Sequence, residues 1–220
     1  MREVAGAVAN ERMRQVATGI MLGIGVYVLL DIVLQLLPPH YSPIRQAESD
    51  MGVGPYGWLM DLNFLLRGAV SVGAAWLLTR LFPKGQLPRF GLGAMWAFGI
   101  GSAILAFFPT DILDDPHLVP HPVATLHGDV HLVVAALAFL AAAIGVLVVG
   151  FTVSRSSELA GGRPLAIILA VVAAMALLAL RAAGRHHVGG LDERLFLGLV
   201  LLWIFVLSLR VRRASGGVAQ

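Results

Sequence analysis

Six apolar stretches, most of them close to 20 residues long, constrain the fold of this chain more than any other feature. A helix needs about 20 mainly apolar residues to cross the roughly 30 Å hydrocarbon core of a bilayer. The stretches span residues 16–37, 58–81, 90–108, 126–151, 165–180 and 191–209. Because lipid offers no hydrogen-bond partner to an unpaired backbone group, each stretch is expected to be helical. The sequence therefore predicts an all-α integral membrane bundle of about six transmembrane helices, forming a single domain over residues 1–220.

The composition supports a bilayer environment and excludes several classes of function. Hydrophobic residues make up 58% of the chain and charged residues 13%, whereas soluble domains are nearer half apolar and a quarter charged. The chain has no cysteine, which excludes disulfides, thiolate metal sites and cysteine catalysis. The basic residues lie at the ends of the apolar stretches rather than in one patch, so no nucleic-acid binding is expected.

The distribution of basic residues predicts the orientation in the membrane. Of the 16 Lys and Arg residues, eleven lie on the side that holds both termini, and four lie on the other side. Cytoplasmic loops carry the excess of Lys and Arg in membrane proteins. We therefore expect a multi-pass protein of the plasma (inner) membrane with both termini in the cytoplasm.

All seven histidines fall on the predicted outer side, and four of them lie within residues 107–131. His127 and His131 are four residues apart at the start of the fourth stretch, which places both imidazoles on one helix face. Such a pair can bind a divalent metal such as zinc when a carboxylate completes the site. Asp111 and Asp115 are the candidate carboxylates and candidate catalytic bases. The alternative is that these side chains only solvate the outer loops.

A second outer segment, GRHHVGGLDER at residues 184–194, offers further candidates. His186 and His187 are alternative metal ligands, and Arg194 is a candidate for holding an anionic headgroup. A single haem bound between His131 and His186 is the alternative cofactor. The two acids of this segment fit the first turn of a helix on electrostatic grounds alone, so capping accounts for them.

Asp31, Asp61 and Arg67 form a second cluster of candidate residues, within the first two predicted spans. Asp31 is six residues before the outer end of the first span, Asp61 is near the outer surface, and Arg67 is close to the midplane. An arginine at the bilayer centre costs several kcal/mol unless it is paired or hydrated. We therefore predict a salt bridge from Arg67 to Asp31 or Asp61.

Polar residues recur along the second span beside this arginine. Asn63, Arg67 and Ser71 are spaced by four residues and so share one helix face. Asn63 and Ser102 are expected to hydrogen-bond near Arg67. This group either binds a substrate headgroup or ion, or forms a structural polar core that fixes the helix register.

Several segments resemble an uncharacterised family of prokaryotic membrane proteins, known as domain of unknown function 998. The similar segments are YSPIRQAESD at residues 41–50, the region around Asn63, FPTD at residues 108–111, the region around His127, and GLDERL at residues 190–195. The resemblance covers most of the chain and implies a multi-span membrane fold with no established activity. It directs attention to Asn63, Asp111, His127 and Arg194.

These observations leave several functions open, and they do not decide whether the chain is an enzyme. The first is a metal-dependent hydrolase or transferase acting on a lipid or other small amphiphile at the outer leaflet. The second is a membrane protein that binds a single haem or a small ligand. The third is an ion- or proton-linked transporter or sensor, and the fourth is a membrane protein with a purely structural polar core.

Overall fold

The computed structural model describes residues 2–82, 85, 87–113, 115, 117–154, 163–182 and 189–216. These residues form six α-helices and one short 3₁₀-helix, and there is no strand among them. The α-helices are α1 (Arg2–Leu36), α2 (Gly57–Leu81), α3 (Arg89–Leu105), α4 (Leu126–Ser154), α5 (Arg163–Ala182) and α6 (Gly189–Gly216), and the 3₁₀-helix is η1 (Glu48–Gly52). The predicted all-helical bundle is confirmed.

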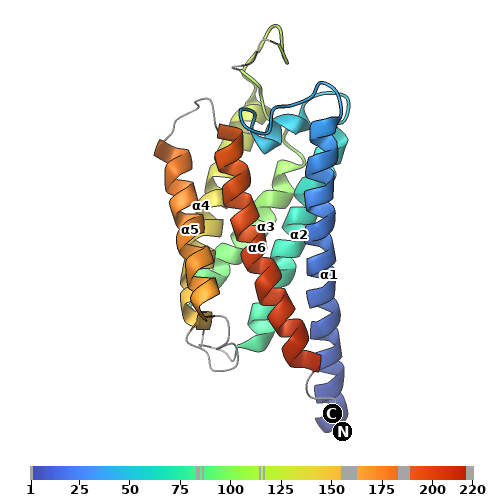
Figure 1. Ribbon diagram of the computed structural model, residues 1–220, viewed down its shortest axis with the longest axis vertical. Coiled ribbons are helices and arrows are strands. Elements are labelled where there is room, and N and C mark those ends of the chain that lie inside the picture. The colour runs from blue at the N-terminus through green and yellow to red at the C-terminus, as the bar shows by residue number, and fades with distance from the viewer. Residues whose placement is uncertain are drawn as a thin grey trace.

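Four helices contain segments that are long and apolar enough to cross a membrane. These segments are Asn10–Leu36, Gly57–Leu81, Leu126–Val153 and Gly189–Ser215, and the apolar segments Arg89–Leu105 and Ile167–Ala176 are shorter. Helix α1 has 35 residues and is therefore about 52 Å long, well beyond the thickness of the hydrocarbon core. Its first turns extend past most of the bundle (Figure 1), where Arg14 pairs with Glu11 at 2.9 Å.

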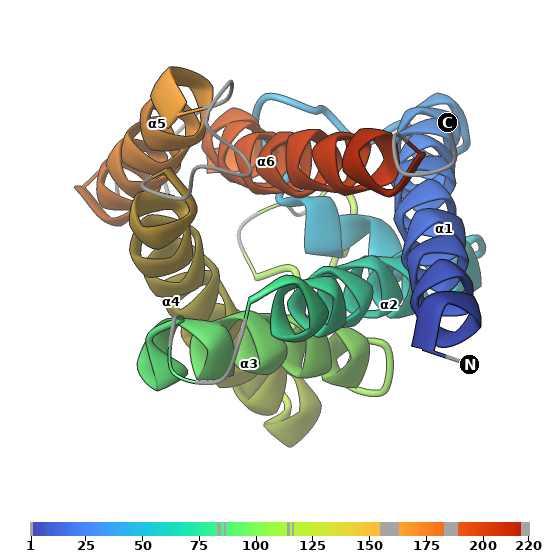
Figure 2. The same cartoon turned by 90° about the horizontal axis from the view of Figure 1, so that it is seen from below.

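The six helices form a closed ring. Each helix packs against its neighbours in the sequence, and α6 returns to pack against α1 (Figure 2). Consecutive helices run in opposite directions, so α1 begins and α6 ends at the same end of the bundle (Figure 1). We call the opposite end, which carries η1, the distal end. It is the end that the count of basic residues predicts to face outward.

Glycines allow α2 and α3 to approach closely beside Arg67. A Cβ atom at Gly68 would lie 2.8 Å from the carbonyl oxygen of Gly99. One at Gly99 would lie 2.9 Å from the backbone nitrogen of Val72. Small residues at such contacts are typical of helix packing in membranes. The close approach brings Arg67 of α2 within hydrogen-bond distance of Ser102 of α3.

The segment between α1 and α2 folds onto the distal end of the ring. Its short helix η1 contacts α1, α2 and α6. The segment is held by a separate core cluster made of Leu34, Tyr41, Met51, Met60, Phe64, Leu105 and Ile112. The Tyr41 hydroxyl also donates a hydrogen bond to the carbonyl of Val53. This packing carries Glu48, the first residue of η1, into the interior of the bundle.

Candidate functional site

Arg67 of α2 lies inside the bundle and pairs with Glu48 of η1. Its Nη1 is 3.1 Å from Glu48 Oε2, and its Nε donates to Ser102 Oγ at 3.2 Å. The two charged side chains are only 1% and 2% exposed. The Tyr27 hydroxyl donates to the other carboxylate oxygen of Glu48, so both oxygens have a partner. The ion pair is therefore buried and well hydrogen-bonded.

The prediction that Arg67 pairs with Asp31 or Asp61 is wrong. Asp61 precedes Arg67 by six residues, which turns its side chain about 120° away from the face of Arg67. Asp31 instead lies 3.7 Å from Nε of Arg194 and accepts a hydrogen bond from Gln35 at 2.5 Å. Arg67 pairs with Glu48 instead, because the segment between α1 and α2 folds back into the bundle. We call this segment the distal segment.

The polar stripe predicted on α2 is buried, but its members differ in their contacts. The hydrogen bond expected between Arg67 and Ser102 is confirmed. Asn63 and Ser71 are 0% exposed. Among the described residues, their side chains have no hydrogen-bond partner, so the bond expected for Asn63 is not formed.

The contacts among Tyr27, Glu48, Arg67 and Ser102 form one polar network. Two residues in the first turns of α6 extend it. Arg194 Nη1 donates to the carbonyl oxygens of Pro43 and Gln46 at 3.2 and 2.9 Å. This contact ties the segment before η1 to α6. Glu193 is buried, and its Oε2 accepts a hydrogen bond from the backbone nitrogen of Glu48 at 3.2 Å. Glu193 was expected to serve only as a helix cap, but it lies in the interior of the bundle.

The sequence analysis assigned no place beside Arg67 to three members of the network: Tyr27, Glu48 and Glu193. Tyr27 precedes Asp31 by four residues and Gln35 follows it by four, which is the spacing that marks the stripe on α2. This spacing indicates from the sequence alone that Tyr27 shares a polar helix face with Asp31. Glu48 is in a segment with no apolar periodicity, and only its long-range packing shows that it is buried.

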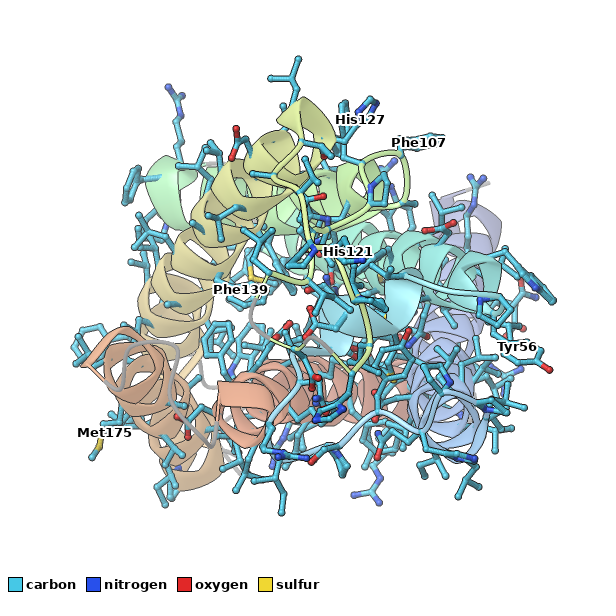
Figure 3. All side chains as sticks on the ribbon, turned by 90° about the horizontal axis from the view of Figure 1, so that it is seen from above. Tyr56, Phe107, His121, His127, Phe139 and Met175 are labelled. Atoms are coloured by element: carbon cyan, nitrogen blue, oxygen red, sulfur yellow. The ribbon has the colours of Figure 1, made fainter. Side chains whose placement is uncertain are left out.

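The described residues do not assemble the predicted metal site. His131 is buried, and its Nδ1 donates to the Phe108 carbonyl at 2.6 Å. His127, one turn earlier, is exposed at the edge of the distal end (Figure 3). In the part of the chain that the structure describes, no group of three His, Asp or Glu side chains could hold a metal ion. His186 and His187 lie outside the described residues, so their role as ligands, and haem binding, remain predictions.

The two candidate catalytic carboxylates hold loops in place. Asp111 accepts hydrogen bonds from the nitrogen and hydroxyl of Thr125 at 2.6 and 3.0 Å. The Thr125 hydroxyl in turn accepts one from Gly128 at 3.1 Å, which caps the start of α4. Asp115 accepts a hydrogen bond from the amide of Gln46 at 2.6 Å. These contacts give both carboxylates a structural role. Their catalytic role stays a prediction.

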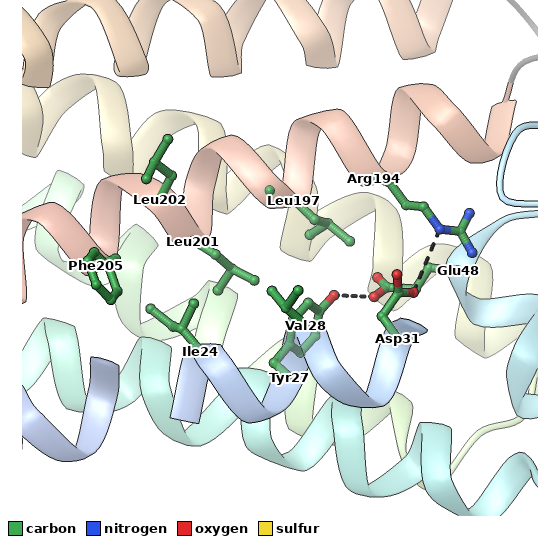
Figure 4. Close-up of a pocket in the computed structure, with 11 residues that line it drawn as sticks. Ile24, Tyr27, Val28, Asp31, Glu48, Arg194, Leu197, Leu201, Leu202 and Phe205 are labelled. Atoms are coloured by element: carbon green, nitrogen blue, oxygen red, sulfur yellow. Dashed lines mark hydrogen bonds and ion pairs between the residues drawn. The ribbon is translucent and has the colours of Figure 1, made fainter. Parts of the chain in front are cut away.

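A cavity of about 470 Å³ lies between α1 and α6 (Figure 4). Its volume is typical of small-molecule sites, which occupy about 300–1,000 Å³. The walls are formed by Ile24, Val28, Leu197, Gly198, Leu201, Leu202 and Phe205. Polar groups gather at the end nearer the distal loops and comprise Tyr27, Asp31, Glu48 and Arg194. The cavity is therefore apolar along its length and charged at one end.

Comparison with known proteins identifies a family of unknown function. The model of the family described as "Protein of unknown function (DUF998)" matches residues 21–210. No curated protein and no solved structure matches the chain. The matched range contains the ion-pair network and every residue that lines the cavity.

Proposed function

Because the chain belongs to the DUF998 family of proteins of unknown function, we propose its function from its own geometry: it binds a lipid-like amphiphile in the cavity between α1 and α6. The tail lies along the apolar wall, and the headgroup meets Asp31 and Arg194. The predicted orientation puts that headgroup in the outer leaflet. A metal-dependent reaction is not part of the proposal, since Asp111 and His131 do not line the cavity.

The separation of polar and apolar lining carries this proposal. From Arg194 to Phe205 the cavity follows twelve residues of α6, and the eleven steps between them amount to about 16 Å. A water-soluble metabolite of that length would leave polar groups unpaired against the apolar wall, at a cost of several kcal/mol. An amphiphile leaves no such group, because its polar atoms are all at the charged end.

The cavity is also open toward the lipid. Val28 of α1 and Leu202 of α6 line it and are 48% and 45% exposed. In a bilayer, exposed apolar side chains of membrane-spanning helices contact acyl chains. A ligand can therefore enter sideways from the membrane and keep its tail in an apolar environment throughout.

Photolabelling of the full-length protein in non-ionic detergent micelles tests the proposal. The probe is a 12-carbon alcohol with a photoreactive diazirine in its tail, and labelled peptides are identified by mass spectrometry. We expect saturable labelling of α1 and α6 around the cavity, with competition by unlabelled dodecanol. Labelling spread over all exposed helices without saturation would overturn the proposal.

Two glycine substitutions give a matched pair of variants. Gly198 lines the cavity, and a Cβ atom there would have no atom within 4 Å, so Gly198→Leu adds a side chain at the cavity wall whose Cβ meets no neighbour. A Cβ atom at Gly93 of α3 would likewise have no atom within 4 Å, and Gly93 lies outside the cavity. We expect Gly198→Leu to reduce saturable labelling at least tenfold and Gly93→Leu to leave it unchanged. Equal labelling of the two variants would show that the probe binds elsewhere.

A further inference from the structure

We infer that the cavity takes an uncharged amphiphile whose headgroup is a hydroxyl, which both donates and accepts a hydrogen bond. This inference rests on the proposed function and specifies its ligand class. It follows from two buried polar atoms at the polar end of the cavity, the end lined by Tyr27, Asp31, Glu48 and Arg194. One of these atoms is a donor and the other an acceptor, and they lie side by side without a hydrogen bond.

The acceptor is Oδ1 of Asp31. This residue lines the cavity from α1, and its other carboxylate oxygen, Oδ2, accepts a hydrogen bond from Gln35 at 2.5 Å. Among the described residues, the buried Oδ1 has no hydrogen-bond partner. A buried acceptor without a donor is unfavourable, so this oxygen favours a ligand that donates to it.

The donor is Nε of Arg194, a residue that lines the cavity from α6 (Figure 4). The Nη1 of this guanidinium already donates to three backbone carbonyl oxygens, and its Nη2 donates to Met51 Sδ at 3.9 Å. Nε is buried as well, and it has no hydrogen-bond acceptor within the part of the chain that the structure describes. It is therefore the group of Arg194 that is left for a ligand.

The distance between the two atoms suits a shared hydroxyl. Asp31 Oδ1 and Arg194 Nε are 3.7 Å apart, which is too far for a direct hydrogen bond and close enough for one oxygen to bond to both. A hydroxyl carries one donor hydrogen and two acceptor lone pairs, so it can donate to Oδ1 and accept from Nε at the same time. An ether oxygen only accepts and an ammonium only donates, so each of them leaves one of the two atoms unpaired.

The charges around the polar end are matched, which disfavours an ionic headgroup. Asp31 faces Arg194 at 3.7 Å, and Glu48 pairs with Arg67 at 3.1 Å. The further acid of the network, Glu193, does not line the cavity. An ion without a counter-ion is costly in a low-dielectric interior. A neutral headgroup avoids that cost and still meets the donor and the acceptor.

Competition among three ligands of equal tail length tests the inference. Dodecanol, dodecyl methyl ether and dodecylamine compete with the photoreactive alcohol at neutral pH, and each concentration is expressed as a mole fraction in the micelle. We expect dodecanol to compete more strongly than either of the others by roughly tenfold, the effect of one hydrogen bond to a charged group. An ether or an amine as strong as the alcohol overturns the headgroup assignment while leaving amphiphile binding intact. If none of the three competes, the proposed function itself fails.

Asp31→Leu assigns this selectivity to the polar end. The substitution keeps the branching of the side chain and removes its acceptors, so dodecanol should lose its advantage over the ether while the ether competes as before. Asp129→Leu, at an exposed position of α4, removes a carboxylate outside the cavity and should retain that advantage. An advantage of dodecanol that survives Asp31→Leu contradicts the assignment of Asp31. The comparison of the three ligands on the unmodified protein decides the headgroup class even where a variant does not fold.

Discussion

Glu48→Gln tests whether the buried ion pair holds the distal segment on the bundle. The substitution keeps the shape of the side chain, so the Arg67 guanidinium remains buried without its hydrogen-bonded counter-ion. At an effective dielectric constant near 20, unit charges 3.1 Å apart attract by about 5 kcal/mol. Breaking one side of a buried pair costs roughly 3–5 kcal/mol. We expect the free energy of unfolding to fall by that amount, which corresponds to roughly 6–20 °C in melting temperature.

Equilibrium unfolding in mixed micelles, followed by fluorescence of the four tryptophans, measures this loss. Glu11→Gln is the matched control, because Glu11 forms a pair of similar length with Arg14, at 2.9 Å, on an exposed surface. We expect its unfolding curve to overlay that of the unmodified protein. The double variant Glu48→Gln/Arg67→Met leaves no buried charge unpaired and should recover part of the loss. A Glu48→Gln curve that coincides with that of Glu11→Gln would refute the reasoning.

Two further predictions concern the start of α4 and the orientation in the membrane. Thr125→Ala removes the hydroxyl that joins Asp111 to the first turn of α4. We expect it to lower the free energy of unfolding by about 0.5–2 kcal/mol in the same assay, and no change would argue against the cap. Because the chain has no cysteine, an impermeant maleimide applied to intact cells should label Tyr56→Cys and not Ser215→Cys. The opposite labelling pattern would place the termini outside.

Hydropathy predicts where the helices cross the membrane better than where they end. It predicts residues 16–37 for the first helix, which in fact runs Arg2–Leu36. The helix continues through polar residues because intrahelical backbone bonds form equally well in water, where Glu11 and Arg14 are exposed. It predicts residues 90–108 for the third helix, which ends at Leu105, four residues before Pro109. The length of an apolar stretch indicates which part of a helix contacts lipid. The ends of the helix depend on backbone hydrogen bonding, which apolar length does not indicate.

The sequence predicts that Arg67 is paired, but not its partner. An unpaired arginine near the bilayer midplane is too costly, and this argument requires only its position in the span. The partner depends on the path of residues 41–53, which hydropathy assigns to water. That path is set by the burial of Tyr41 and Met51 and by the contact of Arg194 with loop carbonyls. Neither contact leaves a periodic pattern in the local sequence.

Two of the charged residues that line the cavity, Glu48 and Arg194, also hold the fold, and this determines which variants are informative about binding. Glu48 lines the cavity and neutralises Arg67, and Arg194 lines it while fixing the distal segment. A loss of ligand at either position therefore follows from a displaced segment as readily as from a lost contact. Asp31 bonds within its own helix to Gln35 and approaches Arg194 only at 3.7 Å, and Gly198 borders open space. Binding can be separated from stability at these two positions, because neither holds the distal segment in place.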